Sequence, residues 1–462
     1  MSKASIHSIE LGRARSSTPT IDACTIVPIL ACAYSIMIGP LIYFTFPPAE
    51  GLQGMLESRT EQRIFWPALA AISVILVIRN RSRLGRDTLP PNIVCLFAYL
   101  TFAGASGLWA FRPELSFIRF AQEVMVLASI VLPGMLAVRT ADLMRGLFLC
   151  FALAAILNVF FVFDNPSSLV ERLKGYPGYF TGKNLLGEFA AITFLLSLHE
   201  VFYPGLRRAL GIIMIITSTL LLLWSNSRTS HGLALVVPFL AALTLLVAKR
   251  MRISPAIILL AIPICYAALS GMYPRFNMYR VSYALFGDAT FSGRSIIWEF
   301  ALKEIELRPL LGWGYQSFWL VGPDAPSIVD APGFIKTMPN AHNGYYDTML
   351  EMGYVGYALL VSFVVATLHG IGRVAERDLR RAWLLLSLAL YVIIHNGIES
   401  TWMRAFDLMW VVFLMVATET GRHWQLLPLK RVAYAPRTPP PRQHRAEAGP
   451  RASAVDPSGK LQ

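Results

Sequence analysis

The feature that most limits what this chain can fold into is a series of long apolar runs, repeated from near its start to near its end. A helix that crosses a bilayer needs about 20 predominantly apolar residues. About twelve runs meet or approach that length, at roughly 24–46, 64–79, 91–111, 116–138, 146–163, 184–201, 209–224, 231–247, 254–271, 352–372, 382–396 and 405–420. The sequence therefore predicts an all-α polytopic membrane protein.

The composition agrees with a membrane protein. Of the 462 residues, 55% are hydrophobic and 15% are charged, whereas a soluble domain carries about 25% charged residues. A formal charge of +13 would suggest nucleic-acid binding in a soluble protein. In a membrane protein it is explained by Lys and Arg in cytoplasmic loops, so no nucleic-acid partner is expected. The five cysteines form no CxxC pair, which indicates neither a disulfide framework nor a thiolate metal site.

Basic residues in the short loops predict the orientation. If the N-terminus is cytoplasmic, every short basic loop falls on the same side, as the positive-inside rule requires. These loops lie near residues 79–86, 139–145, 207–208, 249–252 and 373–381. We therefore expect both termini in the cytoplasm. The longest polar interruption, at about 272–351 between spans 9 and 10, then lies outside as one large loop.

Composition also divides the chain into three parts. Residues 1–22 are polar and basic, and residues 422–462 are rich in Pro, Arg and Ala, so both are predicted to be disordered cytoplasmic tails. Residues 23–421 form the membrane domain between them. The first apolar run is too long for a signal-peptide core, so we interpret it as a membrane helix. No internal repeat of the kind found in many secondary transporters is visible.

His342 is the candidate general base of the large loop. Asn340 or Asn343 could cap the helix that follows, and the dipole of that helix would favour a neutral imidazole, the form that a base needs. Tyr345 and Tyr346 could stack on a sugar. A lone histidine is more often structural than catalytic, so the catalytic interpretation rests on the residues beside His342.

Two arginines stand where an anion could bind. Arg228 lies in a tight turn between two spans, where its guanidinium could reach a phosphate or could simply anchor the helix at the membrane surface. Arg294 is predicted in the first turn of an amphipathic helix that Ser292 could cap. Because cations are disfavoured at a helix N-terminus, Arg294 makes more sense beside a bound anion; the alternative is an ordinary surface arginine.

Other outward-facing positions are basic but not metal-binding in character. Lys183 and Asn184 begin the sixth span, and Arg275 and Arg280 lie early in the large loop. The outer segments contain no DxD motif, no pair of histidines at i,i+4 and only dispersed carboxylates, so no metal site is expected. Arginines would then have to neutralise a pyrophosphate by themselves, which their bidentate geometry permits.

Three sequence blocks resemble the O-antigen ligase and polysaccharide polymerase superfamily of bacterial inner membranes. They are Ser227-Arg228-Thr229; Gly293-Arg294 with Trp298 and the segment 308–314; and His342-Asn343-Gly344 with the segment 351–356. Their order around one large outer loop is fairly specific, and the resemblance covers about residues 183–357. The segment 180–187 looks most like the exopolysaccharide-polymerase branch, although that branch has a histidine where this chain has Gly182.

The resemblance implies a metal-independent, inverting glycosyltransferase that needs no cofactor and uses an undecaprenyl-pyrophosphate-linked glycan at the periplasmic face. In that family the loop histidine activates the acceptor hydroxyl and arginines hold the pyrophosphate. These catalytic roles carry over to His342, Arg228 and Arg294. The residues expected to bind substrate are Lys183, Asn184, Arg275, Arg280, Asn343 and Tyr345.

Several functions remain open at this level. The acceptor could be another repeat-unit chain, which would make the protein a polymerase, or lipid A-core, which would make it an O-antigen ligase, or a protein hydroxyl; the polymerase is preferred. A transporter or flippase of lipid-linked sugars also fits twelve spans. A transporter should carry ionisable residues at mid-membrane, however, and the predicted span centres are nearly free of charge.

Overall fold

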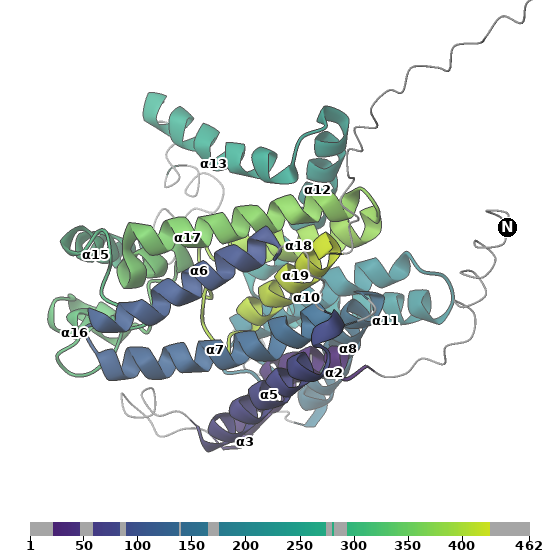
Figure 1. Cartoon of the computed structure of the whole chain (residues 1–462), viewed down its shortest axis with the longest axis horizontal. Helices are drawn as coiled ribbons and strands as arrows, with labels where there is room; N and C mark the ends of the chain where they lie inside the picture. Colours follow the sequence, from purple (N-terminus) through teal and green to yellow (C-terminus); the bar gives the residue numbers. More distant parts are fainter. Residues whose placement is uncertain are drawn as a thin grey trace, which may run out of the picture. The chain divides into compact units, whose positions relative to one another are not determined.

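The computed structural model describes residues 22–46, 59–83, 89–137, 140–164, 175–273, 280 and 293–425. Within these ranges every regular element is a helix, so the predicted all-α membrane architecture is confirmed (Figure 1). The predicted tails, 1–22 and 422–462, lie outside the described residues except for residue 22 and residues 422–425. The candidates Arg275 and Ser292 also lie outside the described residues.

The helices follow the predicted spans in order. Before the large loop they are α2 (Ala23–Ala33), the π-helix η1 (Tyr34–Ile38), α3 (Gly39–Thr45), α5 (Thr60–Arg79), η2 (Arg81–Arg83), α6 (Pro91–Ala105), η3 (Ser106–Leu108), α7 (Pro113–Leu136), α8 (Thr140–Asp164), α10 (Lys183–Val201), α11 (Leu206–Ser225), α12 (Arg228–Met251) and α13 (Pro255–Met272). Within and after the loop they are α15 (Arg294–Leu307), α16 (Pro326–Val329), η5 (Gly333–Thr337), α17 (Gly344–Ala375), α18 (Leu379–His395) and α19 (Leu408–Gln425). The last helix therefore extends beyond residue 421, where the cytoplasmic tail was predicted to begin.

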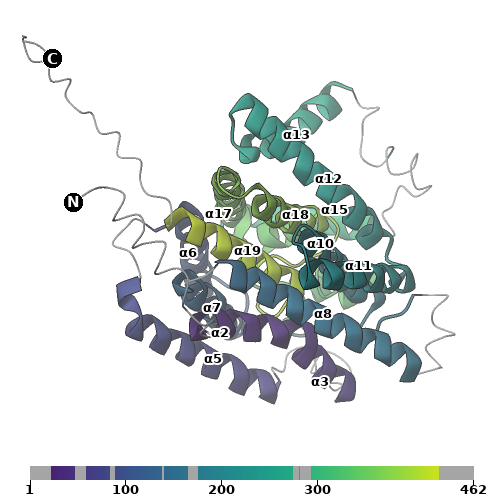
Figure 2. The ribbon, with the colours of Figure 1, turned by 90° about the vertical axis from the view of Figure 1, so that its right-hand side faces the viewer.

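In the described part of the chain nine helices are long and apolar enough to cross a membrane, fewer than the twelve or so predicted. The other three predicted spans correspond to α10, α18 and α19, which lie inside the bundle. Residues 409–417 of α19, for example, have no exposed surface, and α19 packs among α7, α17 and α18 (Figures 1 and 2). α18 has 17 residues and is slightly too short to be counted. α10 and α19 are less apolar, which a helix shielded from lipid by its neighbours can tolerate.

The expectation that span centres carry almost no charge is wrong at Glu123. This side chain lies near the middle of α7, is fully buried, and accepts a hydrogen bond of 2.7 Å from the Trp410 indole of α19. Closer to the helix ends, a buried pair joins Glu188 in the second turn of α10 to His395, the last residue of α18, with 3.3 Å between Oε1 and Nε2. Charge in the spans therefore does not by itself separate an enzyme from a transporter.

The large loop ends at α17, which begins at Gly344 and whose helical backbone is interrupted at Gly353, close to the predicted loop end at about residue 351. The described part of the loop packs α15, α16 and η5 around a small hydrophobic core of its own, which includes Ile297, Phe318 and Trp319. α15 and α16 lie together at the end of the bundle where α17 begins (Figure 1).

A kink in α17 connects this outer region to the membrane helix. Gly353 has φ 63° and ψ −168° inside the helix, and the N–H of Tyr354 donates to the carbonyl of Pro309 at 2.7 Å. A Cβ on Gly353 would lie 2.2 Å from the backbone of Leu310, so both the positive φ and the close approach require glycine. Two blocks that are separate in sequence, 308–314 and 351–356, therefore pack on each other.

Candidate active site

His342 lies immediately before α17, outside its first turn. Its φ of 47° is in the left-handed region, which is uncommon for a residue other than glycine, and its N–H donates to Asn340 Oδ1 at 2.9 Å. Asn343 is the N-cap of the helix, and its Oδ1 accepts from the N–H groups of Tyr345 and Tyr346. The expectation that one of these asparagines caps the helix is confirmed for Asn343.

The imidazole of His342 shares one carboxylate with Arg294. Nδ1 of His342 lies 2.8 Å from Oε2 of Glu399, and Nη2 of Arg294 donates to Oε1 of the same residue at 2.5 Å. Because an ionised carboxylate can only accept, the proton belongs on Nδ1 and the lone pair on Nε2. The His342 side chain is 30% exposed and that of Arg294 is 20% exposed, so both can be reached from outside the bundle.

Glu399 is kept ionised by these two partners. Burial raises the pKa of its carboxyl, but the hydrogen bond from His342 and the positive charge of Arg294 outweigh burial, so the pKa is lowered overall. A buried carboxylate that orients an imidazole and fixes its tautomer is a recurring arrangement in enzymes that use histidine as a base. The pair therefore has the geometry of a general base with a positioning carboxylate.

The segment that carries Glu399 is tied to the start of α17. The N–H of Gly344 donates to the carbonyls of both Asn396 and Glu399, at 2.9 and 3.0 Å, and the N–H of Asn343 donates to Ser400 Oγ at 2.9 Å. A Cβ on Gly344 would lie 2.2 Å from Asn396 Oδ1. Glycine at this position therefore allows the approach that sets His342 opposite Glu399.

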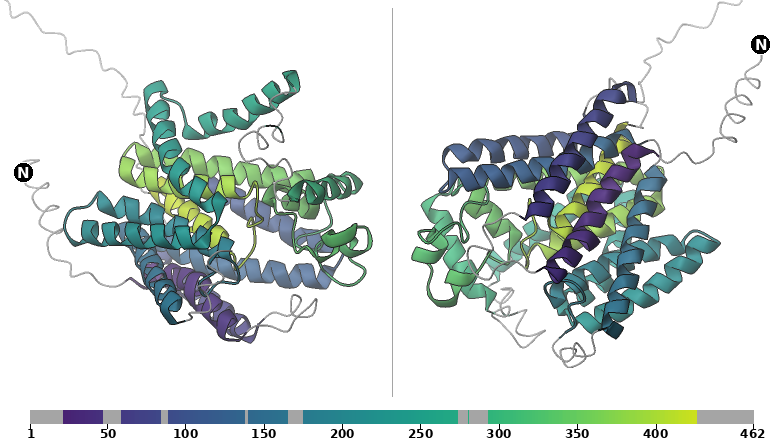
Figure 3. Two further views of the ribbon diagram at one scale, coloured as in Figure 1. Left: turned by 180° about the vertical axis from the view of Figure 1, so that it is seen from behind. Right: turned by 90° about the horizontal axis from the view of Figure 1, so that it is seen from below.

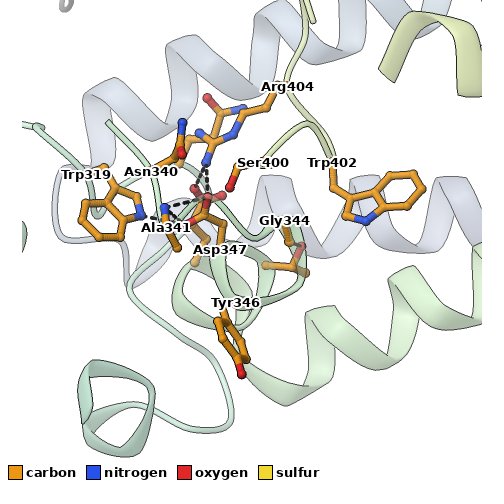
Figure 4. Close-up of polar contacts among 12 residues, drawn as sticks. Trp319, Asn340, Ala341, Gly344, Tyr346, Asp347, Ser400, Trp402 and Arg404 are labelled. Carbon is orange, nitrogen blue, oxygen red and sulfur yellow. Dashed lines mark hydrogen bonds and ion pairs between the residues drawn. The ribbon is translucent and has the colours of Figure 1, made fainter. Parts of the chain in front are cut away.

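Asp347 holds three segments of the site together (Figure 4). Its carboxylate accepts hydrogen bonds from Trp319 Nε1 at 2.7 Å and from the N–H of Ala341 at 3.1 Å, and Arg404 Nη2 lies 3.4 Å from its other oxygen. Arg404 also donates to Glu351 at 2.9 Å. These contacts fix the backbone next to His342 relative to both α17 and the segment between α18 and α19.

α15 is fixed to the same backbone by Trp298. The indole Nε1 donates to the carbonyl of Ala341 at 3.0 Å, and Trp298 lies about one helical turn after Arg294. The hydrogen bond therefore holds the Arg294 end of α15 beside His342. As predicted, Arg294 is in the first turn of a helix, but the N-cap is Gly293 and not Ser292.

Arg228 is the first residue of α12. It belongs to a second group of predicted site residues, together with Lys183 and Asn184. It is exposed, as are Lys183 and Asn184 at the start of α10. The two helix starts are neighbours, since a Cβ on Gly187 would lie 2.6 Å from the Cβ of Ser227. The structure therefore brings Lys183, Asn184 and Arg228 to one place.

This second group lies at the same end of the bundle as Glu399. Glu188, in the second turn of α10, contacts His395, the last residue of α18, and Glu399 follows four positions later. Among the described residues no hydrogen bond or ion pair joins Arg228 directly to His342 or Arg294. A single ligand would have to extend from one group to the other in order to contact both.

The remaining predicted residues differ in their surroundings. The Tyr345 hydroxyl donates to the carbonyl of Ile393 at 2.7 Å, and Nδ2 of Asn343 donates to the carbonyl of Gly397 at 3.2 Å. Both side chains are thus used within the protein, and substrate binding by them stays a prediction. Arg280 is exposed, and Arg275 is not among the described residues.

Two residues of the site, Glu399 and Arg404, are absent from the sequence-based candidates. A signal was present, because residues 397–404 are a short polar segment between the last two predicted spans. The predicted orientation puts that segment on the same side of the membrane as the large loop. In the described ranges no three His, Cys, Asp or Glu side chains gather so that they could hold a metal ion.

The sequence is similar to a known protein family and to several named proteins. Residues 213–361 match the family model described as O-antigen ligase. The chain is 23% identical over 284 residues to the exopolysaccharide production protein ExoQ of Rhizobium meliloti (strain 1021), an alignment that covers 60% of this chain and 64% of that protein. It is 29% identical over 126 residues to a protein of Rickettsia prowazekii (strain Madrid E) named "Putative polysaccharide ligase", covering 26% of this chain and 31% of that protein. The chain thus spans less than two thirds of the length of these relatives. The matched family region includes Arg228, Arg294 and His342 but ends before Glu399.

Proposed function

Because this chain belongs to the O-antigen ligase family, we propose that it transfers a glycan from an undecaprenyl-pyrophosphate-linked donor to a hydroxyl acceptor at the periplasmic face of the bacterial inner membrane. The observation that supports this most is the shared carboxylate of Glu399. It holds an imidazole suited to a hydroxyl group and a guanidinium suited to a phosphate on its two oxygens. The reaction needs both of these groups at the same place.

His342 is the proposed base. With Nδ1–H donated to Glu399, Nε2 takes the proton of the acceptor hydroxyl as the acceptor oxygen attacks the anomeric carbon. The bond from that carbon to the pyrophosphate oxygen breaks, and the electron pair leaves with undecaprenyl pyrophosphate. Attack opposite the leaving group inverts the anomeric centre. General base catalysis of this kind contributes about 10²–10⁴-fold.

Arg294 and Arg228 are the proposed electrostatic partners of the leaving group. Negative charge grows on the pyrophosphate as the glycosidic bond breaks, and a well-placed donor to such charge is worth roughly 3–4 kcal/mol. Arg294 has five N–H donors and uses one on Glu399, so the others remain for phosphate oxygens. We propose that these arginines stabilise the negative charge on the leaving pyrophosphate without a divalent cation.

For the acceptor, we prefer another repeat-unit glycan, which would make the protein a polymerase of surface polysaccharide. The similarity to an exopolysaccharide production protein covers more of this chain than the similarity to the polysaccharide ligases. The ligase names favour a second candidate, transfer to lipid A-core. The glycan profile of a deletion strain separates the two, since loss of long chains indicates a polymerase and loss of glycan on lipid A-core indicates a ligase.

The enzyme proposal is tested by transfer from purified lipid-linked donor in the presence of a chelator. His342→Gln keeps an amide that can hydrogen-bond but cannot accept the proton, and it should lower product formation by about 10²–10⁴-fold. His423→Gln, at the other end of the bundle, is the matched control and should be close to wild type. If His342→Gln kept more than roughly a tenth of wild-type activity, below the loss expected for a base, the catalytic role would be wrong. A transporter would instead show altered movement of the donor across the membrane.

A further inference from the structure

A pocket lies at the end of α17 that is far from His342. It has a volume of about 580 Å³ and is lined by the end of α12, the turn into α13, and residues from the end of α17 to the start of α18. His369 in its wall lies 25 positions beyond Gly344, the first residue of α17, and this length of helix, kinked at Gly353, corresponds to about 38 Å at 1.5 Å per residue. The pocket is therefore separate from the candidate active site and, in the predicted orientation, faces the cytoplasm.

Basic side chains dominate the rim of this pocket. Lys249 and Arg252 come from the end of α12 and Arg373 from α17, while Glu376 is the acidic residue in the lining. Lys249 and Arg252 are exposed, and no hydrogen bond or ion pair of either side chain occurs within the described ranges. Their charge is therefore not neutralised by the part of the protein that the structure shows, and Glu376 offsets only part of it.

Arg373 has a donor that the surrounding protein does not use. Its guanidinium lies over the ring of Trp424, 4.5 Å from the ring centroid. Its Nε atom is buried and has no hydrogen-bond partner among the described residues. Arg373 also lines the pocket, and among the described residues its positive charge has no carboxylate partner, so it adds to the positive charge of the rim.

The start of α13 completes the polar wall. Nδ1 of His369 lies 3.0 Å from Oγ of Ser254, the N-cap of α13. A Cβ on Gly372 would lie 2.6 Å from Pro255 Cδ, so α13 begins in direct contact with α17. The N-terminus of a helix carries partial positive charge and attracts anions, which adds to the charge of the arginines and the lysine.

Beyond this contact α13 leaves the bundle. Its buried residues are Pro255 and Ala256, and the left view of Figure 3 shows the rest of the helix extending away from the bundle. Figure 2 shows the same helix at the outside of the bundle. Ile257, Leu260 and Ile264 are between 40% and 60% exposed. In a membrane these side chains are covered by acyl chains, so a continuous apolar surface leads from the lipid to the basic pocket.

We propose that this pocket binds the headgroup of an anionic glycerophospholipid, such as phosphatidylglycerol, from the cytoplasmic leaflet. The phosphate lies among Lys249, Arg252 and Arg373, and the acyl chains lie along α13. The basic charge selects an anion, and the apolar surface of α13 selects a lipid over free phosphate. Basic pockets between membrane helices at the cytoplasmic surface suit such headgroups.

Native mass spectrometry of the detergent-purified full chain tests the proposal. Phosphatidylglycerol should be retained more strongly than phosphatidylcholine with the same acyl chains. Replacing both Lys249 and Arg252 by Gln should weaken phosphatidylglycerol retention about 25-fold, since each basic side chain near an anionic lipid contributes a factor of about five. Each single change, Lys249→Gln or Arg252→Gln, should weaken retention about five-fold. Arg250→Gln, which removes one positive charge from the same helical turn outside the pocket lining, is the matched control for these single variants and should retain the lipid.

Three results would overturn the proposal. Equal retention of the two lipids would remove the anion specificity. An equal loss in Arg250→Gln would show that the charge acts over the whole surface and not in the pocket. Displacement of the lipid by soluble glycerol phosphate at the same concentration would assign the site to free phosphate. Because the readout is lipid binding, the result does not depend on whether the protein transfers glycans.

Discussion

The sharpest prediction concerns Glu399, which contacts both candidate catalytic side chains. Replacing it with Gln preserves the size of the side chain but replaces one carboxylate oxygen with an N–H donor. If that donor faces Nδ1 of His342, the imidazole proton moves to Nε2 and the base is lost. If the amide oxygen faces Nδ1 instead, the tautomer survives, but the negative charge that stabilises the forming imidazolium is gone.

The expected size of the effect follows from these contacts. Fixing the wrong tautomer costs up to about 10⁴ in rate where a buried carboxylate orients a histidine base, and the weaker case is about 10². We therefore expect kcat/KM of Glu399→Gln to fall by about 10²–10⁴, which is roughly 3–5 kcal/mol of transition-state stabilisation. Glu399→Asp keeps the charge and should recover part of this loss.

The assay is glycan transfer from purified donor, with Glu299→Gln as the control because Glu299 is exposed on α15 and pairs with Lys303. A double-mutant cycle gives the decisive comparison. If Glu399 acts through His342, adding Glu399→Gln to His342→Gln should cost little more than either change alone. Fully additive losses would refute this coupling. Acidification through the lowered pKa of Glu399 should reduce the wild-type rate, because protonation of this carboxyl removes the acceptor of the Nδ1 hydrogen and the negative charge beside His342.

Three further predictions test the leaving-group site, the orientation and the kink. Arg294→Ala and Arg228→Ala should each lower turnover by about 10²–10³ in the transfer assay, and Lys should rescue only in part; near-normal product from the Arg228 variant would make it a membrane anchor. Single cysteines at Asp330 and Glu376 in a cysteine-free protein should react with an impermeant label from opposite sides, and labelling of both from outside would reverse the orientation. Gly353→Ala should destabilise the protein in thermal unfolding by about 1–3 kcal/mol because of the clash at the kink; an unchanged midpoint would contradict that packing.

The membrane fold could be predicted because contact with lipid constrains the composition of each helix individually. A helix that faces lipid must be apolar over its whole length, so hydropathy finds it without knowledge of its neighbours. The same reasoning explains the differences in α10 and α19, whereas α18 differs because it has only 17 residues. Those helices are surrounded by protein, so their composition depends on tertiary contacts such as the Glu188–His395 pair, which no local pattern shows.

The candidate site was predictable only where a residue stands in a distinctive local setting. His342, Arg228 and Arg294 lie at helix boundaries in unusual polar segments, and sequence position alone draws attention to them. Glu399 follows His342 by 57 positions, and the two meet because Gly344 packs against the segment after α18. Such a contact follows from the packing of α17 against α18, and hydropathy carries no information about it.

The sharing of Glu399 also bears on how the site could work through a complete reaction. A carboxylate held only by His342 could rotate while the imidazole is neutral, because the attraction between opposite charges arises only after the imidazole has taken up the proton. Here Arg294 binds the second oxygen, so the carboxylate is held from both sides. Arg294 retains donors for a pyrophosphate after this contact, so binding the donor need not release Glu399. We therefore expect the orientation of His342 to be the same before and after donor binding, with the base ready as soon as the acceptor hydroxyl arrives.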